Sequence, residues 1–99
     1  MPRVTWTLPA ADSLKQIRSF LNSQNPASAQ KAVLAIRSHS KTLLNHPHAG
    51  RPVRDLPDEY REYIVPFGSS GYVMRYRVVP TGIVILAIRH QKQSGNPSI

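Results

Sequence analysis

Two amphipathic helical stretches, separated by only a few residues, most constrain the fold of this chain. In the first, from Ala10 to Ser23, apolar residues recur at three- and four-residue steps: Leu14, Ile17 and Leu21. In the second, which follows Pro26, the apolar positions are Ala29, Val33, Ile36 and Leu43 or Leu44. Each stretch therefore predicts a helix with one apolar face that must be buried against another element.

Capping residues set the expected helix ends. Thr7 is a suitable N-cap before Pro9 in a first helical turn. Gln24-Asn25-Pro26 breaks the periodicity, and it supplies an N-cap and a first-turn proline for the second helix. Pro47 cannot continue that helix, so we expect it to end near Asn45. The short connection predicts an antiparallel helical hairpin.

Strand-like segments flank the hairpin in the sequence. They are Arg3 to Leu8, Tyr60 to Pro66, Tyr72 to Val79 and Gly82 to Arg89. Turn signals lie at residues 68–71 and 80–82, and residues 45–59, which hold three prolines, indicate an ordered loop. The order β-α-α-β-β-β predicts an α+β fold, with the hairpin packed on one face of a mostly antiparallel sheet. The last strand is the most apolar, so we expect it at the centre of the sheet.

The net charge of +8, with 13 Lys and Arg against 5 Asp and Glu, favours a polyanionic partner such as nucleic acid, a ribosome or an acidic protein. The chain has no cysteine, which excludes disulfides and thiolate chemistry. His46 and His48 flank Pro47 in a turn, so we expect no metal site and no cofactor. With no signal peptide and no apolar run long enough for a bilayer, we expect a cytoplasmic protein that does not contact membranes.

Arginines on neighbouring strands form the first candidate site. Arg75 and Arg77 are two residues apart and therefore point to the same sheet face, which Arg61 and Arg89 are expected to join. Arginine binds phosphate or carboxylate groups through two parallel hydrogen bonds, so this face is a candidate polyanion site. The nearby acidic residues Asp58, Glu59 and Glu62 are interpreted as a solvated edge, although Glu62 is placed to pair with an arginine.

Of the four histidines in the chain, His90 is the one that suggests catalysis. It ends the last strand among cations, where it is a candidate base. RNA cleavage needs such a base together with cations for the phosphorane, a role for Arg61 and Arg75. A structural or binding role for His90 stays open. The chain lacks a glycine-rich phosphate loop and a nucleophile elbow.

Four motifs, in this order and spacing, resemble the RelE/ParE toxin superfamily. They are His46-Pro47-His48-Ala49-Gly50-Arg51-Pro52-Val53, Leu56-Pro57-Asp58-Glu59-Tyr60-Arg61-Glu62, Tyr72-Val73-Met74-Arg75-Tyr76-Arg77-Val78 and Ile85-Leu86-Ala87-Ile88-Arg89-His90-Gln91-Lys92-Gln93. The resemblance runs from about Val4 to Gln93. It implies a small basic toxin, encoded beside an antitoxin that neutralises it, with roles in growth inhibition and plasmid maintenance.

The resemblance also separates two branches of the superfamily. RelE-like members cleave mRNA in the ribosome, whereas ParE-like members poison DNA gyrase. Ribonuclease members typically carry arginine where this chain has Val73 and Gln91, and a tyrosine after His90 that is missing here. These departures favour the ParE-like branch, a binding protein rather than an enzyme, and leave a RelE-like endoribonuclease as the alternative. A nucleic-acid-binding module that is not a toxin would explain the charge but not the motif order.

The resemblance and the charge together define the expected site and domain. If the protein is a ribonuclease, the catalytic residues are Arg61, Arg75 and His90. The expected target- or nucleic-acid-binding residues are Arg51, Arg54, Arg61, Arg75, Arg77, Arg89, His90 and Lys92. We expect one RelE/ParE-like toxin domain over residues 1–93 and a flexible tail over residues 94–99. The expected partners are an antitoxin and DNA gyrase, or the ribosome with its mRNA.

Overall fold

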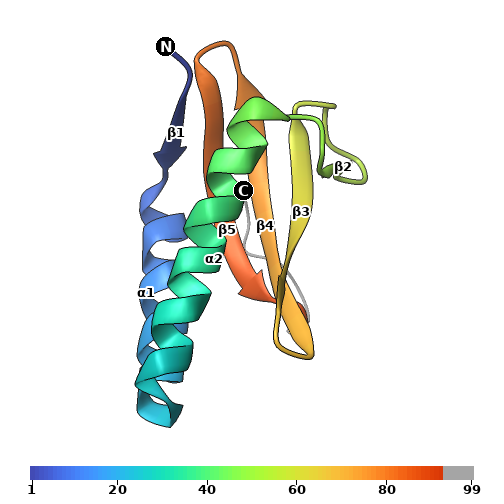
Figure 1. Cartoon of the computed structure of the whole chain (residues 1–99). Helices are drawn as coiled ribbons and strands as arrows, with labels where there is room; N and C mark the ends of the chain where they lie inside the picture. The colour runs from blue at the N-terminus through green and yellow to red at the C-terminus, as the bar shows by residue number, and fades with distance from the viewer. Residues whose placement is uncertain (93–99) are drawn as a thin grey trace.

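A helical hairpin covers one face of a five-stranded sheet in the computed structural model, which describes residues 1–92 (Figure 1). The elements are β1 (Arg3–Trp6), α1 (Leu8–Gln24), α2 (Pro26–Asn45), β2 (Arg51–Pro52), β3 (Tyr60–Phe67), β4 (Ser70–Val79) and β5 (Gly82–His90). The predicted α+β class and element order are confirmed, with β2 as an addition. The tail predicted at residues 94–99 lies outside the described residues.

Both helices begin at the predicted caps. The Thr7 hydroxyl accepts a hydrogen bond from the Ala10 N–H at 3.2 Å, and the Asn25 side chain accepts one from the Ala27 N–H at 3.0 Å. Such caps each stabilise a helix by about 1 kcal/mol. The Thr7 hydroxyl also donates to the carbonyl of Ile85 at 3.0 Å, which fixes the start of α1 to β5. Neither helix within residues 1–92 is long and apolar enough to span a bilayer.

The sheet has the order β1-β5-β4-β3-β2. β1 pairs with β5 in parallel and the other neighbours are antiparallel, as predicted for a mostly antiparallel sheet. A parallel pair needs a long crossover, which the rest of the chain supplies. The prediction that β5 is central was wrong in detail: β5 has a neighbour on each side, but β4 is the middle strand. The reason is β2, a two-residue strand within the predicted loop, which extends the far side of the sheet.

The core lies between the hairpin and one sheet face. The fully buried side chains include Ile36 and Leu43 from α2, together with strand residues Val65, Met74, Tyr76, Ile83 and Ile85. Leu43 is buried and Leu44 only partly so, which decides between the two predicted positions. Because side chains alternate along a strand, burying Met74 and Tyr76 beneath the helices places Arg75 and Arg77 on the opposite face, as predicted.

Candidate functional site

The arginine face is the sheet face turned away from α1 and α2, with Arg51, Arg75, Arg77 and Arg89 among its side chains. Strand register puts them there. Arg51 and Arg75 both pair with Glu62, and Arg89 pairs with Val73, two residues before Arg75. Arg75 is opposite Ala87 and Tyr76 is opposite Ile85, so Leu86 is an extra residue that bulges from β5. Bulges increase local twist, and this one lies beside Arg75.

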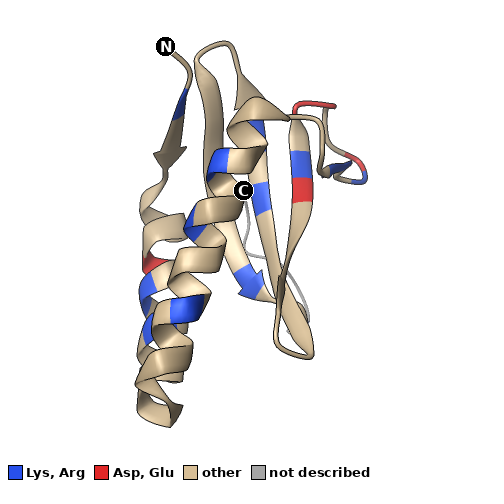
Figure 2. Ribbon diagram, viewed as in Figure 1, with Lys and Arg blue, Asp and Glu red and all other residues tan. Residues whose placement is uncertain are grey.

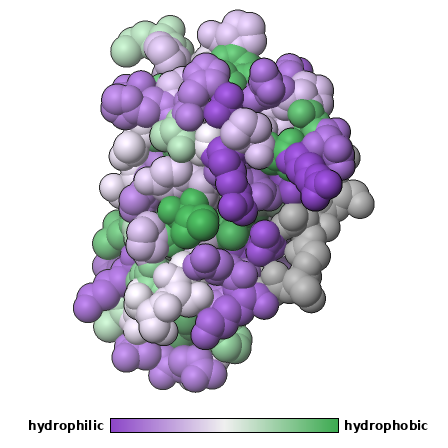
Figure 3. Space-filling view, turned by 90° about the vertical axis from the view of Figure 1, so that its right-hand side faces the viewer, coloured by the Kyte–Doolittle hydropathy of each residue, from purple (hydrophilic) through white to green (hydrophobic). Residues whose placement is uncertain are grey.

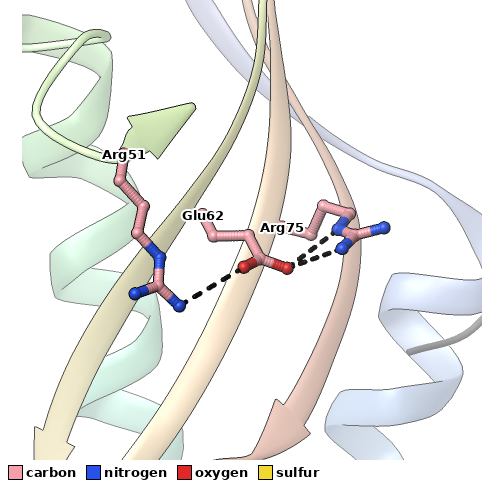
Figure 4. A network of polar contacts seen from close by, with 3 residues as sticks. All are labelled: Arg51, Glu62 and Arg75. Atoms are coloured by element: carbon pink, nitrogen blue, oxygen red, sulfur yellow. Dashed lines mark hydrogen bonds and ion pairs between the residues drawn. The ribbon is translucent and has the colours of Figure 1, made fainter. Parts of the chain in front are cut away.

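Glu62 lies between two arginines in a row across three strands (Figure 4). Its Oε2 accepts hydrogen bonds from Arg75 Nε at 3.0 Å and from Arg75 Nη2 at 2.8 Å. Its Oε1 lies 3.7 Å from Arg51 Nη2. The side chains of Glu62 and Arg75 are only 9% and 13% exposed, whereas that of Arg51 is 68% exposed. The pairing of Glu62 with an arginine is therefore confirmed. Its interpretation as part of a solvated edge was wrong, because cross-strand pairing buries its carboxylate.

Arg77, like Arg51, is an accessible member of the face. Its Nη2 lies 3.8 Å from Glu59 Oε2, and both side chains are more than 40% exposed, at 46% and 42%. Its guanidinium carbon also lies 5.6 Å from the centre of the Tyr60 ring, a cation–π contact. Exposed pairs of this kind contribute about 0–1 kcal/mol, so Arg77 can exchange its partner for a ligand at low cost.

Arg61 does not join the arginine face, which corrects the prediction. It pairs with Tyr76, and directly paired residues share a face, so its side chain lies on the helix side. There the guanidinium donates to three backbone carbonyls: Gly50 at 2.9 Å, Asp58 at 3.2 Å and His48 at 3.4 Å. Arg61 therefore holds the loops that flank β2. The sequence showed that Arg61 is on a strand, but not that the loops on either side of β2 pack against its side chain.

Tyr76 completes this anchor. Its hydroxyl donates to the Pro47 carbonyl at 2.6 Å and accepts from the Gly50 N–H at 2.9 Å. Burial raises the pKa of Tyr76 above its usual value, so the hydroxyl stays protonated and able to donate. Gly50 is the residue that fits here, because a Cβ would lie 2.6 Å from the hydroxyl oxygen. The sequence did not predict this polar role of Tyr76.

Replacing Tyr76 by phenylalanine should lower the free energy of unfolding by about 1–3 kcal/mol, because it leaves a buried N–H and a carbonyl without their partner. Urea unfolding of the purified variant would measure the loss. Tyr63→Phe is the matched control, since within residues 1–92 the Tyr63 hydroxyl bonds only to His39 Nδ1, at 3.1 Å, in a part-buried position. If Tyr76→Phe lowers the free energy of unfolding no more than Tyr63→Phe does, Tyr76 does not anchor the loop.

His90 lies on the helix side, at the opposite end of the sheet from Arg61. It pairs with Tyr72, and their rings meet edge to face at 5.5 Å. The His90 Nδ1 accepts from the Lys92 N–H at 3.1 Å, so in a neutral ring the proton is on Nε2. His90 and Lys92 line a groove of about 750 Å³ between α1 and the β3–β4 hairpin, with apolar walls that include Ile17, Phe20 and Tyr72. Phe20 is 65% exposed.

The structure does not bring Arg61, Arg75 and His90 together. The partners of Arg61 and His90 on β4, Tyr76 and Tyr72, are four residues apart, which is roughly 13 Å along a strand. Arg75 points to the other face. General acid–base catalysis needs its groups within hydrogen-bonding reach of one substrate position, so these three residues do not form one catalytic centre in this conformation.

The other predicted binding residues are exposed, and charged residues are unevenly distributed over the molecule. Arg54 and Lys92 are exposed, in the loop after β2 and after the end of β5. Lys and Arg are spread over both helices and the sheet, whereas most Asp and Glu gather around β2 and β3 (Figure 2). From the β2–β3 side, the surface is mostly hydrophilic around a small hydrophobic patch (Figure 3). Within residues 1–92 no cluster of three or more His, Asp or Glu could hold a metal ion.

Comparison with known proteins identifies the family. Residues 4–95 match the model of the ParE toxin of the type II toxin–antitoxin system parDE. The chain belongs to the ParE toxin family. It is thus the toxin component of a type II toxin–antitoxin system, within the RelE/ParE superfamily that the motifs indicated, and its partner is a cognate antitoxin.

Relatives of this ParE-family toxin carry names from both branches. It is 37% identical over 81 residues to toxin RelE3 of Caulobacter vibrioides, covering 82% of this chain and 85% of that protein. It is 31% identical to toxin RelE2 of the same organism, covering 91% and 96%. A solved structure, the chromosomal ParDE system from P. aeruginosa, has a chain with a TM-score of 0.72 and 28% identity, covering 93% of this chain and 98% of that one.

Proposed function

We propose that this toxin inhibits growth by binding DNA gyrase in the cytoplasm, without cleaving RNA. The observation that carries the proposal is the separation of Arg61, Arg75 and His90, which means that these three residues do not form a centre for RNA cleavage. The match to the ParE toxin family over nearly the whole chain supports it as well. A binding role needs a surface rather than a catalytic centre, and no cofactor or metal.

Arg77 is our choice for a target-binding residue on the arginine face. Arg77 on β4 forms an exposed ion pair with Glu59, so an acidic group of a binding partner can take the place of the Glu59 carboxylate. Arg54 and Lys92 are further exposed candidates, at two other edges of the molecule. Arg75 donates to Glu62 and Arg61 donates to backbone carbonyls, which fits support of the surface rather than contact with the target.

The antitoxin fits the groove beside α1. An apolar groove of about 750 Å³ with an exposed phenylalanine suits the apolar side of an amphipathic segment. Lys92, which also lines the groove, adds positive charge that an acidic antitoxin would offset. Binding of a segment that folds on the toxin would also stabilise the toxin by mass action.

A supercoiling assay with antitoxin-free toxin tests the target. We expect the protein to block gyrase supercoiling or to trap cleaved DNA, and the Arg77→Glu variant to be weaker by about tenfold, as for the loss of one charged interface contact. Arg18→Glu is the matched control, because it makes the same charge change at an exposed position on α1. The cognate antitoxin should restore supercoiling. Full gyrase activity at saturating, folded toxin would reject the proposal.

A RelE-like endoribonuclease is the second candidate, favoured by the names of the two Caulobacter relatives. It requires His90, Arg61 and Arg75 to approach one phosphate when the toxin meets the ribosome. Ribosome-dependent cleavage of mRNA, together with untouched gyrase, would support this candidate. Cleavage that survives His90→Ala would then exclude His90 as the base.

A further inference from the structure

The Glu62 carboxylate occupies the position of a bound oxyanion between Arg51 and Arg75 (Figure 4). Two donors of one guanidinium converge on Oε2, and a second guanidinium approaches Oε1 from the opposite side. Arginines on either side of a planar or tetrahedral anion are how proteins hold carboxylate and phosphate groups. The row is therefore built like a phosphate site whose ligand is part of the chain.

The ligand is held in place by the strands themselves. Glu62 is in β3, the strand between β2 and β4, so backbone pairing brings one arginine from each neighbour to its carboxylate. Glu62 is 8% exposed, and its intramolecular position gives it a high effective concentration. A phosphate from solution or from nucleic acid would have to displace a largely buried, hydrogen-bonded carboxylate, at a large desolvation cost.

We propose that Glu62 is a built-in competitor for phosphate. Its carboxylate prevents nucleic acid from binding to Arg51 and Arg75. Two guanidinium groups and one carboxylate leave the row with a single net positive charge. Removing the carboxylate frees both arginines for a phosphate group of RNA or DNA. Glu62 is thus a specificity residue of the arginine face.

Neutral variants of Glu62 provide the test. Glu62→Ala opens the position to a ligand, and Glu62→Gln keeps the side-chain size in case the alanine variant does not fold. The probes are inorganic phosphate and a fluorescent single-stranded RNA oligonucleotide. We expect phosphate to raise the Tm of the Glu62 variants more than that of the wild type, with sodium chloride at equal ionic strength as reference. We expect their affinity for RNA to rise about tenfold, as for one added charge-assisted phosphate contact.

Glu59→Gln is the matched control, because it makes the same change of net charge beside the exposed Arg77. A general electrostatic effect would raise RNA affinity equally in Glu59→Gln and Glu62→Gln, and that result would overturn the proposal. So would wild-type protein that binds RNA as tightly as the Glu62 variants, or variants that phosphate stabilises no better than chloride. The Tm and RNA-affinity measurements do not depend on gyrase. The failure of this proposal can therefore be distinguished from the failure of the proposed gyrase inhibition.

Discussion

Replacing Arg75 by alanine is expected to lower the free energy of unfolding by about 3–5 kcal/mol, one of the largest losses available from a single substitution in this chain. The reason is the carboxylate left behind. Glu62 and Arg75 have side chains only 9% and 13% exposed, and Arg75 Nε and Nη2 both donate to Glu62 Oε2. Without them, Glu62 keeps Arg51, whose Nη2 is 3.7 Å from Oε1 and which is itself well exposed.

Urea unfolding of Arg75→Ala and Arg77→Ala, side by side, measures this loss. Arg77 is two residues along the same strand and also pairs with a glutamate, but at 3.8 Å and with both side chains exposed, so we expect a loss of about 0–1 kcal/mol. The double variant Arg75→Met with Glu62→Leu should recover much of the stability, because it removes both charges together. Equal losses from the two arginines would contradict the assignment of Arg75 to a buried pair.

Local sequence signals predicted most of this fold because the segments that form it are strongly periodic. The apolar steps of Leu14, Ile17 and Leu21, with the caps Thr7 and Asn25, were enough to place both helices within a few residues of their bounds. The two-residue strand β2 could not be predicted in this way. Arg51 and Pro52 carry no alternating pattern, and the pair forms because β3 offers an edge and because Tyr76 and Arg61 fix the loop beside it.

Site prediction was limited by register rather than by residue type. Arg75 and Arg77 were assigned correctly to one face because their spacing on a single strand decides it. Arg61 was not, because its face depends on which residue of β4 it meets, and that follows from turn geometry. Glu62 illustrates the same limit: pairing with an arginine was foreseen, but its two partners, Arg51 and Arg75, follow from the register of β2 and β4 on β3.

Replacing Gly82 by alanine is expected to cost about 2–6 kcal/mol, the sum of backbone strain and overlap with β1. Gly82 has a φ of 137°, and an added Cβ would overlap the carbonyl oxygen of Arg3 and lie 2.7 Å from its nitrogen. Arg3 pairs with Gly82 where parallel pairing of β1 begins, so the clash is with backbone that has no rotamer to change. We therefore expect β1 to separate from β5 at this end.

The comparison that isolates the clash is Gly68→Ala, measured by thermal or urea unfolding beside Gly82→Ala. Gly68 also has a positive φ, 61°, but a Cβ there would meet nothing within 4 Å, so only the conformational cost of about 1–2 kcal/mol applies. Amide hydrogen exchange should show faster exchange at Arg3 in Gly82→Ala, since the Arg3 N–H donates to the Thr81 carbonyl at this end of the β1–β5 pair. Similar losses from the two glycines would mean that β1 adjusts freely, and that its pairing with β5 contributes little to the stability of the fold.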